Sequence, residues 1–230
     1  MQVAFTAEVE RSLGEQGFAR LPGVLAGEEC DRLVARYEDE NAFRKTVVMA
    51  RHGFGRGEYR YFADPVPAFV SELRAALYAP LAPIANQWWQ QLGVDTRYPP
   101  TLSECLARSH AAGQRLPTPL LLRYRAGDFN CLHQDLYGEF FFPFQVAVLL
   151  AEPERDFTGG EFVLVEQRPR MQSRPIVVPL RKGDAVVFPC RDRPRRGTRG
   201  FHRTIVRHGV SEVRSGHRHA LGLIFHDAAT

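Results

Sequence analysis

His133 and Asp135, separated by Gln134, have the residue types and the spacing of a metal-binding pair. Residues i and i+2 of a β-strand point to the same face of a sheet, so an imidazole and a carboxylate at these positions can bind one ion. Two ligands are too few for a stable site, and a His-x-Asp tripeptide alone is a weak signal. The pair therefore predicts a metal site only if a later strand supplies a third ligand.

Two histidines are candidates for that third ligand, His202 in GFHRTIV and His208 in RHGVSEV. A second imidazole would complete the set of two histidines and one carboxylate that non-haem Fe(II) oxygenases use, with coordination positions left open. The residue types alone do not choose between His202 and His208.

Short strands after Pro117 are expected to hold these residues in place. Apolar runs rich in β-branched residues alternate with Gly, Pro and Asp turns, which is typical of antiparallel sheets. Six or more such runs predict a sandwich or barrel with helices packed outside it. The fold class we expect is α+β, mainly β, with a double-stranded β-helix (a cupin-like jelly roll) as its core. The runs are 120–124, 144–150, 161–167, 175–180, 185–189 and 220–225.

The first part of the chain reads as helices that support this core. Apolar side chains recur at helical spacing between residues 27 and 43 and again from Phe69 to Leu77, and a third helix is expected over roughly 102–112. The second helix leads towards Trp88 and Trp89, which we expect to pack inside the protein. Residues 49–62, MARHGFGRGEYRYF, are rich in Gly, Arg and aromatic residues, so we expect a loop there.

Length and composition are those of a globular protein with one domain. The 230 residues are 44% hydrophobic and 24% charged, and no repeat divides them. We expect a single domain over 1–230, with helical support and a substrate loop in 1–115 and the jelly roll in 116–230. No apolar run reaches the length of a membrane span, and the N-terminus lacks the apolar core of a signal peptide, so we expect no membrane partner and a cytoplasmic location.

The four cysteines show no CxxC spacing, which argues against a zinc finger or a disulfide framework. Positive charge is concentrated elsewhere: nine arginines and only two acids lie between Arg191 and Arg218. This stretch could approach phosphate backbones or acidic partners, and it could equally be a solvated loop and strand edge.

Four short motifs follow one another in the second half of the chain. They are HQD at 133–135, TGGEF at 158–162, RKGDAVVF at 181–188 and HGVSEVRSGHRHALGLIF at 208–225. In this order they resemble the 2-oxoglutarate oxygenase superfamily, particularly its prolyl-hydroxylase-like branch. The resemblance covers residues 120–228, about half of the chain, and each motif is weak by itself.

The resemblance implies Fe(II), 2-oxoglutarate and O₂ as cofactors, and it distinguishes the two distal histidines. Members commonly carry an arginine roughly ten residues after the distal histidine; Arg218 lies ten residues after His208 and sixteen after His202. We therefore expect His133, Asp135 and His208 to be the catalytic metal ligands. The planar guanidinium of Arg218 is expected to bind the far carboxylate of 2-oxoglutarate from inside the sandwich.

Two further residues are expected to contact the cosubstrate. Tyr124 lies nine residues before His133, where superfamily members often place a tyrosine whose hydroxyl reaches 2-oxoglutarate. The sequence departs from the branch in the strand after HQD, where several prolyl hydroxylases have a second tyrosine and this chain has the apolar run 148–150. Gln145 could supply a polar contact in its place.

The chain as a whole also resembles a bacterial family of Fe(II)/2-oxoglutarate oxygenases predicted to act on damaged nucleic-acid bases, through stretches such as MARHGFGRGEYRYF and NCLHQDLYGE. This implies oxidative hydroxylation or demethylation, with DNA or RNA as the partner. The motif order favours an alternative, the hydroxylation of a protein side chain or a small molecule. A second alternative is a non-catalytic metal-binding jelly roll, which predicts no role for Arg218.

Overall fold

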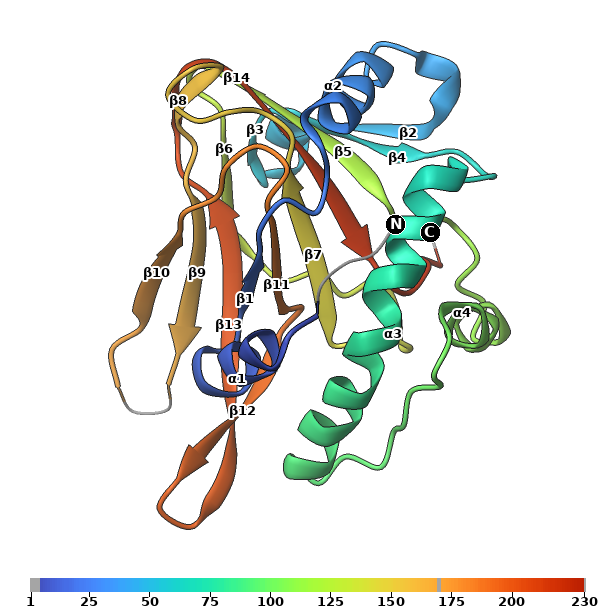
Figure 1. Cartoon of the computed structure of the whole chain (residues 1–230), viewed down its shortest axis with the longest axis vertical. Helices are drawn as coiled ribbons and strands as arrows, with labels where there is room; N and C mark the ends of the chain where they lie inside the picture. The colour runs from blue at the N-terminus through green and yellow to red at the C-terminus, as the bar shows by residue number, and fades with distance from the viewer. Residues whose placement is uncertain (1–4, 169–170, 230) are drawn as a thin grey trace.

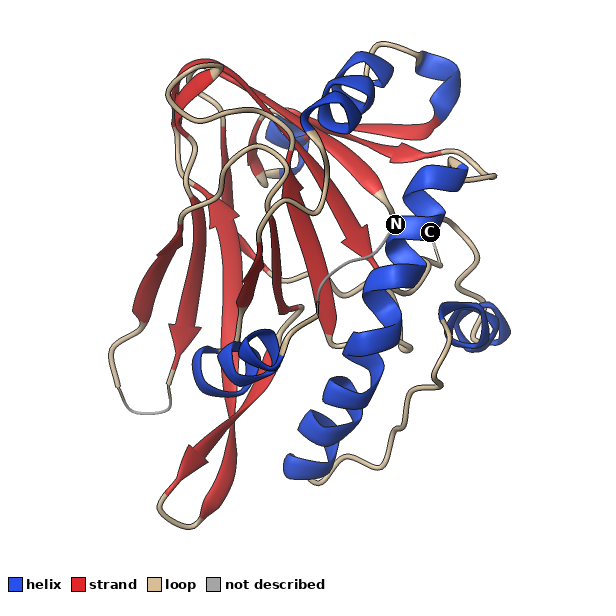
Figure 2. Cartoon of the chain, in the orientation of Figure 1, coloured by secondary structure: helices blue, strands red, loops and turns tan. Residues whose placement is uncertain are grey.

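A computed structural model describes residues 5–168 and 171–229. Two antiparallel sheets face each other, and the helices lie outside them, as the predicted mainly β jelly roll requires (Figures 1 and 2). The helices are α1 (Ala7–Gln16), α2 (Gly27–Arg36), α3 (Ala68–Gln91) and α4 (Leu102–Ala111). None of them, within the described ranges, combines the length and the apolar character needed to cross a membrane.

The larger sheet has eight strands and carries the support helices on its outer face. Its order is β1 (Ala19–Leu21), β11 (Ala185–Pro189), β7 (Phe144–Leu149), β14 (Val213–Ile224), β5 (Leu120–Arg125), β4 (Glu58–Phe62) and β2 (Phe43–Val48), with β8 (Phe157–Gly159) pairing to β14.

The smaller sheet has six strands and holds the histidine-bearing strands side by side. Its order is β10 (Arg174–Val178), β9 (Phe162–Gln167), β13 (Gly200–Val210), β6 (Phe129–His133) and β3 (Gly55–Arg56), with β12 (Asp192–Gly197) pairing to β13. From β5 to β14 the chain passes back and forth between the two sheets, which is the winding of a jelly roll.

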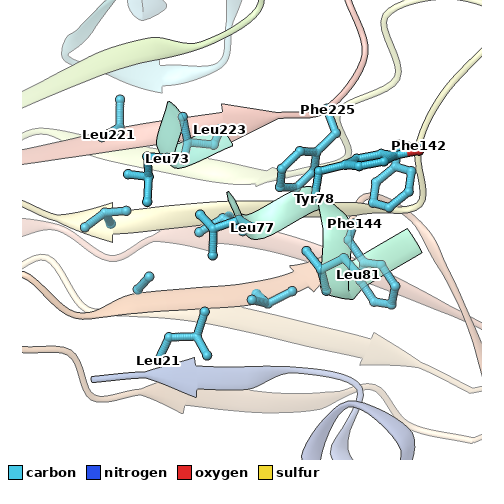
Figure 3. Packing of buried hydrophobic residues seen from close by; sticks show 14 of the residues in the cluster. Leu21, Leu73, Leu77, Tyr78, Leu81, Phe142, Phe144, Leu221, Leu223 and Phe225 are labelled. Carbon is cyan, nitrogen blue, oxygen red and sulfur yellow. The ribbon is translucent and has the colours of Figure 1, made fainter. Parts of the chain in front are cut away.

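Helix α3 packs across the larger sheet and forms much of the core. Leu73, Leu77 and Leu81, which recur at helical spacing, face Phe144 and Leu223 of the sheet (Figure 3). Burying these side chains stabilises the fold by about 2 kcal/mol each. The helix also buries Trp88 and Trp89, at 2% and 4% exposure, so the expectation that both pack inside is confirmed.

In the first part of the chain, one prediction is confirmed with a shorter range and one was wrong. The helix predicted between residues 27 and 43 is present as α2, but it ends at Arg36, and Phe43 begins β2. The prediction of a loop over 49–62 was wrong, because this segment contains a short 3-10 helix, η2 (Met49–His52), followed by β3 and β4. The glycines of this segment favoured the prediction of a loop. Gly55, with φ of 123°, begins β3, and Gly57, with φ of 110°, separates β3 from β4. Strand β4 then pairs with β5 and widens the larger sheet.

Candidate metal and cosubstrate site

His133, Asp135 and His208 converge inside the sandwich. His133 ends β6, Asp135 follows two residues later, and His208 lies opposite His133 in β13. One possible ligand atom from each residue lies within 4.8 Å of the others. The Nε2 atoms of His133 and His208 lie 3.6 Å and 3.2 Å from the two oxygens of the Asp135 carboxylate. The three side chains can therefore bind one ion on a single face.

A β-bulge between β6 and β13 sets the direction of these side chains. His208 pairs with His133 and Val210 pairs with Asn130, so two residues of β6 lie opposite Gly209 alone. A Cβ on Gly209 would lie 2.6 Å from the carbonyl oxygen of Asn130, so only glycine allows the strands this approach. The bulge explains why Asn130 and His133, three residues apart, both line the site.

Hydrogen bonds orient two of the three candidate ligands. The carbonyl of Cys131 lies 2.8 Å from His133 Nδ1, and a proton on Nδ1 leaves the Nε2 lone pair free for a metal. Tyr137 donates to Asp135 Oδ1 at 3.1 Å, and Tyr61 donates to the Tyr137 hydroxyl at 3.2 Å. A chain of two tyrosines thus holds the carboxylate in place.

The electrostatics favour the metal-binding protonation states. Burial raises the pKa of Asp135, but its hydrogen bond to His208 and the nearby imidazoles outweigh burial, and the pKa lies well below its usual value. Burial, and then the neighbouring His133, lower the pKa of His208. An ionised carboxylate beside a neutral imidazole is the combination that a metal ion requires.

The same cavity contains the residues expected at the cosubstrate. It has a volume of about 260 Å³ and is lined by all three candidate ligands and by Tyr124, Gln145 and Arg218. The Tyr124 hydroxyl accepts from Asn130 Nδ2 at 3.3 Å. The Gln145 side-chain nitrogen is buried and, among the described residues, has no hydrogen-bond partner. We call this space the site cavity.

Arg218 is the most unusual group in the site cavity. Its side chain is 3% exposed, its Nε has no hydrogen-bond partner, and no carboxylate in the described ranges forms an ion pair with it. Its guanidinium carbon lies 5.5 Å from the centre of the Tyr124 ring. Burial lowers the pKa of this guanidinium. The attraction of Glu161 acts on this guanidinium without a direct ion pair. A buried cation without an ion-pair partner is costly, so the geometry fits an anionic ligand that enters the cavity.

The glycine turn TGGEF makes room for that arginine. Gly160 has φ of 62°, and a Cβ there would lie 2.8 Å from Arg218 Cδ and 2.9 Å from Val213 Cγ2. The motif therefore does more than begin a strand, because its second glycine borders the Arg218 side chain.

His202 lies apart from this group. It is an exposed residue of β13 and pairs with Arg195 of β12, six residues before His208. Sequence reasoning missed Tyr61 and Tyr137. The Tyr59–Tyr61 alternation in EYRYF was a strand signal that could have placed Tyr61 on one face with Tyr59.

The donor set fits a particular class of metal centre. Two imidazoles and one carboxylate on a single face match the ligands of non-haem Fe(II) oxygenases, and the unpartnered Arg218 fits the far carboxylate of a dicarboxylic cosubstrate. The protein is therefore a 2-oxoglutarate- and Fe(II)-dependent oxygenase, an oxidoreductase whose cofactors are Fe(II), 2-oxoglutarate and O₂. The chain belongs to the oxygenase family described as catalysing oxidative methylation of damaged DNA, which matches residues 57–228.

The chain is also similar to a bacterial protein and to two solved structures. An uncharacterized protein of Mycobacterium tuberculosis is 53% identical over 168 residues, which are 73% of this chain and 72% of that protein. A 2OG-Fe(II) oxygenase-family oxidoreductase from Burkholderia pseudomallei has a similar structure, with a TM-score of 0.59, 18% identity, and coverage of 100% of this chain and 97% of that chain. A prolyl-4-hydroxylase from Pseudomonas putida has a TM-score of 0.52, 16% identity, and coverage of 95% and 97%. These two structures support the jelly-roll fold.

Proposed function

We propose that this oxygenase oxidises a methyl or ring carbon of a nucleic-acid base, with His133, Asp135 and His208 holding the iron. In this proposal Arg218 binds the far carboxylate of 2-oxoglutarate. The observation that carries it is the buried guanidinium of Arg218, unpartnered at Nε, in the same cavity as the three candidate ligands. A non-catalytic jelly roll would have no use for this costly arrangement.

When bound, Fe(II) with 2-oxoglutarate and O₂ supplies the oxidation of a C–H bond, while 2-oxoglutarate is converted to succinate and CO₂. The protein supplies position and shielding. Arg218 binds the distal carboxylate with parallel hydrogen bonds. Tyr124, whose oxygen already accepts from Asn130, keeps its own proton to donate to the cosubstrate, and the free amide nitrogen of Gln145 is a further donor. Apolar side chains such as Phe162 and Phe188 exclude water from the cavity.

Two observations support a nucleobase as the substrate. The family description names damaged DNA. Phe54 lines the site cavity, is 47% exposed, and stacks on His52 with ring centres 5.3 Å apart, so a flat ring that enters the cavity meets aromatic faces. Oxidation of an N-methyl carbon gives an unstable product that loses formaldehyde, so the chemistry expected of this site removes a methyl group from the base.

The test uses the full chain with Fe(II), 2-oxoglutarate and air. Its substrate is a single-stranded DNA oligonucleotide with one N-methylated adenine. Mass spectrometry should show loss of the methyl group together with succinate formation, and the unmethylated oligonucleotide and the His208→Ala variant are the controls. The proposal is overturned if a proline-containing peptide stimulates succinate formation while the methylated oligonucleotide is unchanged.

A further inference from the structure

A hairpin that lies outside the jelly-roll winding extends from the body of the protein. It consists of β12 and the first part of β13, and it projects at the bottom of Figure 2. The strand β13 continues from this hairpin directly to His208. The side chain of Gln134, next to His133, donates to the Val206 carbonyl at 3.3 Å. The hairpin is therefore joined to the HQD segment that lines the site cavity.

The arginines at the base of the hairpin outnumber their carboxylate partners. Buried Glu166 accepts from Arg168 at 2.7 Å and from Arg195 at 2.5 Å, and it lies 3.3 Å from Arg193. Asp192 is shared in the same way: Arg191 and Arg203 each lie 3.3 Å from it. Five arginines thus share two carboxylates.

Three other arginines of this region have no such partner. Arg196, Arg199 and Arg207 are exposed, and no carboxylate of the described residues lies within 4.0 Å of them. These three and the five paired arginines, against Glu166 and Asp192, give a local net charge of +6. Since the whole chain carries +4, the rest of it carries −2. The excess of positive over negative charge is therefore concentrated in this region, which we call the arginine arm, and a polyanion would stabilise it.

The length of β13 between the tip of the arginine arm and the site cavity indicates how much of a polyanion the protein could contact. His202 and His208 are six residues apart in one strand, which corresponds to about 20 Å. That span exceeds one nucleotide and fits several along a strand. Phe201, 44% exposed, lies between the arginines and offers a face on which a base can stack.

We propose that the arginine arm binds the phosphate backbone of a single DNA strand over several nucleotides that flank the base in the site cavity. This rests on the proposed function, because it assumes that the substrate base belongs to a polynucleotide. The arm contributes affinity through phosphate contacts, and the site cavity selects the base.

The test compares two variants of equal charge. In the arm variant, Arg196, Arg199 and Arg207 are all replaced by Gln. In the control variant, the exposed arginines Arg11, Arg32 and Arg36 of α1 and α2 are replaced by Gln. The full chains, loaded anaerobically with Fe(II) and 2-oxoglutarate, are titrated with a fluorescein-labelled twelve-nucleotide oligothymidylate at several salt concentrations. Thermal unfolding confirms that both variants are folded.

Each phosphate contact in single-stranded binding contributes about 0.7 to the slope of log affinity against log salt, so the arm variant should lose about 2 units of slope. The control variant should keep the wild-type slope. The inference is overturned if the arm variant loses no more slope than the control, or if poly-glutamate displaces the oligothymidylate as effectively as unlabelled DNA does, which would indicate an acidic protein partner. If the arm variant binds DNA as tightly as the wild type and still demethylates it, the role of the arginine arm is refuted and the proposed function stands. A wild type that neither binds nor demethylates DNA would refute the proposed function.

Discussion

Two buried arginines, Arg74 in α3 and Arg218 in β14, occupy the interior in opposite ways. Arg74 is 4% exposed and Arg218 is 3% exposed. Arg74 donates through Nε to the Ile224 carbonyl at 2.7 Å and through Nη2 to Asp227 at 3.1 Å and to Thr118 at 3.3 Å. Arg218 has an aromatic ring beside it, an unpartnered Nε, and no ion pair in the described ranges.

This difference indicates that Arg74 has a structural role, whereas Arg218 is placed to bind a ligand. The Arg74 network ties α3 to the C-terminal segment, where Asp227 also meets His110 at 2.8 Å. Because its hydrogen bonds are made within the protein, it needs nothing from outside. For Arg218, the cost of burial is offset only by the longer-range attraction of Glu161 and by the Tyr124 ring until an anion enters the site cavity. Burial alone therefore does not reveal function, whereas burial without a partner does.

Replacing the two buried arginines should change the free energy of unfolding very differently. Arg74→Met should lower the free energy of unfolding by about 3–5 kcal/mol, because it leaves the buried Asp227 carboxylate without its strongest partner. Arg218→Met, which removes a cation without a carboxylate, should be neutral or slightly stabilising. Urea unfolding of the two variants measures the contrast. Equal losses of stability would show that Arg218 is also a structural residue.

Fe(II) affinity should depend on the hydrogen bond between Tyr137 and Asp135 in the site cavity. Tyr137→Phe removes the hydroxyl that donates to Asp135 Oδ1, so Fe(II) affinity should fall by about 10–100-fold while stability changes little. Tyr59→Phe, from the same cavity wall, is the matched control. Anaerobic Fe(II) titration gives the affinities. Wild-type affinity in Tyr137→Phe would mean that the tyrosine chain does not orient the carboxylate.

A pair of glycines tests the space around Arg218. Gly160 and Gly23 have φ of 62° and 59°, so Ala at either position should cost about 1 kcal/mol of stability from backbone strain. Only at Gly160 would the new Cβ meet Arg218, since nothing lies within 4 Å of a Cβ at Gly23. Gly160→Ala should therefore weaken 2-oxoglutarate binding, measured by calorimetry, and Gly23→Ala should not. Equal binding in both variants would contradict the role given to Gly160.

The smallest effect is a pH dependence next to the Arg74 network. Burial and then Arg74 lower the pKa of His226 to about 4. Below pH 6.5 the His226 imidazole binds a proton in the unfolded chain but stays neutral in the folded chain. The free energy of unfolding therefore decreases as the pH falls from 6.5 towards 4. His226 should contribute a loss of about 0.7 kcal/mol between pH 7 and pH 6. In the His226→Asn variant, the free energy of unfolding should lack this loss between pH 7 and pH 6. The same pH dependence in the variant and the wild type would refute the role of His226.

Much of the fold could be read from the sequence, because jelly-roll strands are short β-branched runs between turns. The runs at 144–150 and 185–189 correspond to β7 and β11, and α4 covers most of the helix expected over 102–112. His208 was distinguished from His202 by its distance from Arg218. The structure groups His208 with His133 and Asp135 and leaves His202 on the hairpin.

What could not be read depends on contacts between distant segments. Residues 58–62 form a strand because β5 provides a pairing edge, which no local pattern specifies. Tyr61 reaches Tyr137 across 76 residues of sequence. The arginine-rich stretch gave two equal interpretations, because its pairing with Glu166 depends on the register of β12 and β13 and on where β9 lies.

We propose that one cavity binds Fe(II) through His133, Asp135 and His208 and binds 2-oxoglutarate through Arg218. Anaerobic addition of Fe(II) and 2-oxoglutarate should produce the weak visible absorption band of the chelate in the wild type. The band should survive His202→Ala and be lost in His208→Ala, and Arg218→Ala should require about 100-fold more 2-oxoglutarate to produce it, the loss expected for a buried charge-assisted pair. A wild type without the band, or a band that survives His208→Ala and is lost in His202→Ala, would show that His133, Asp135 and His208 do not form the iron site.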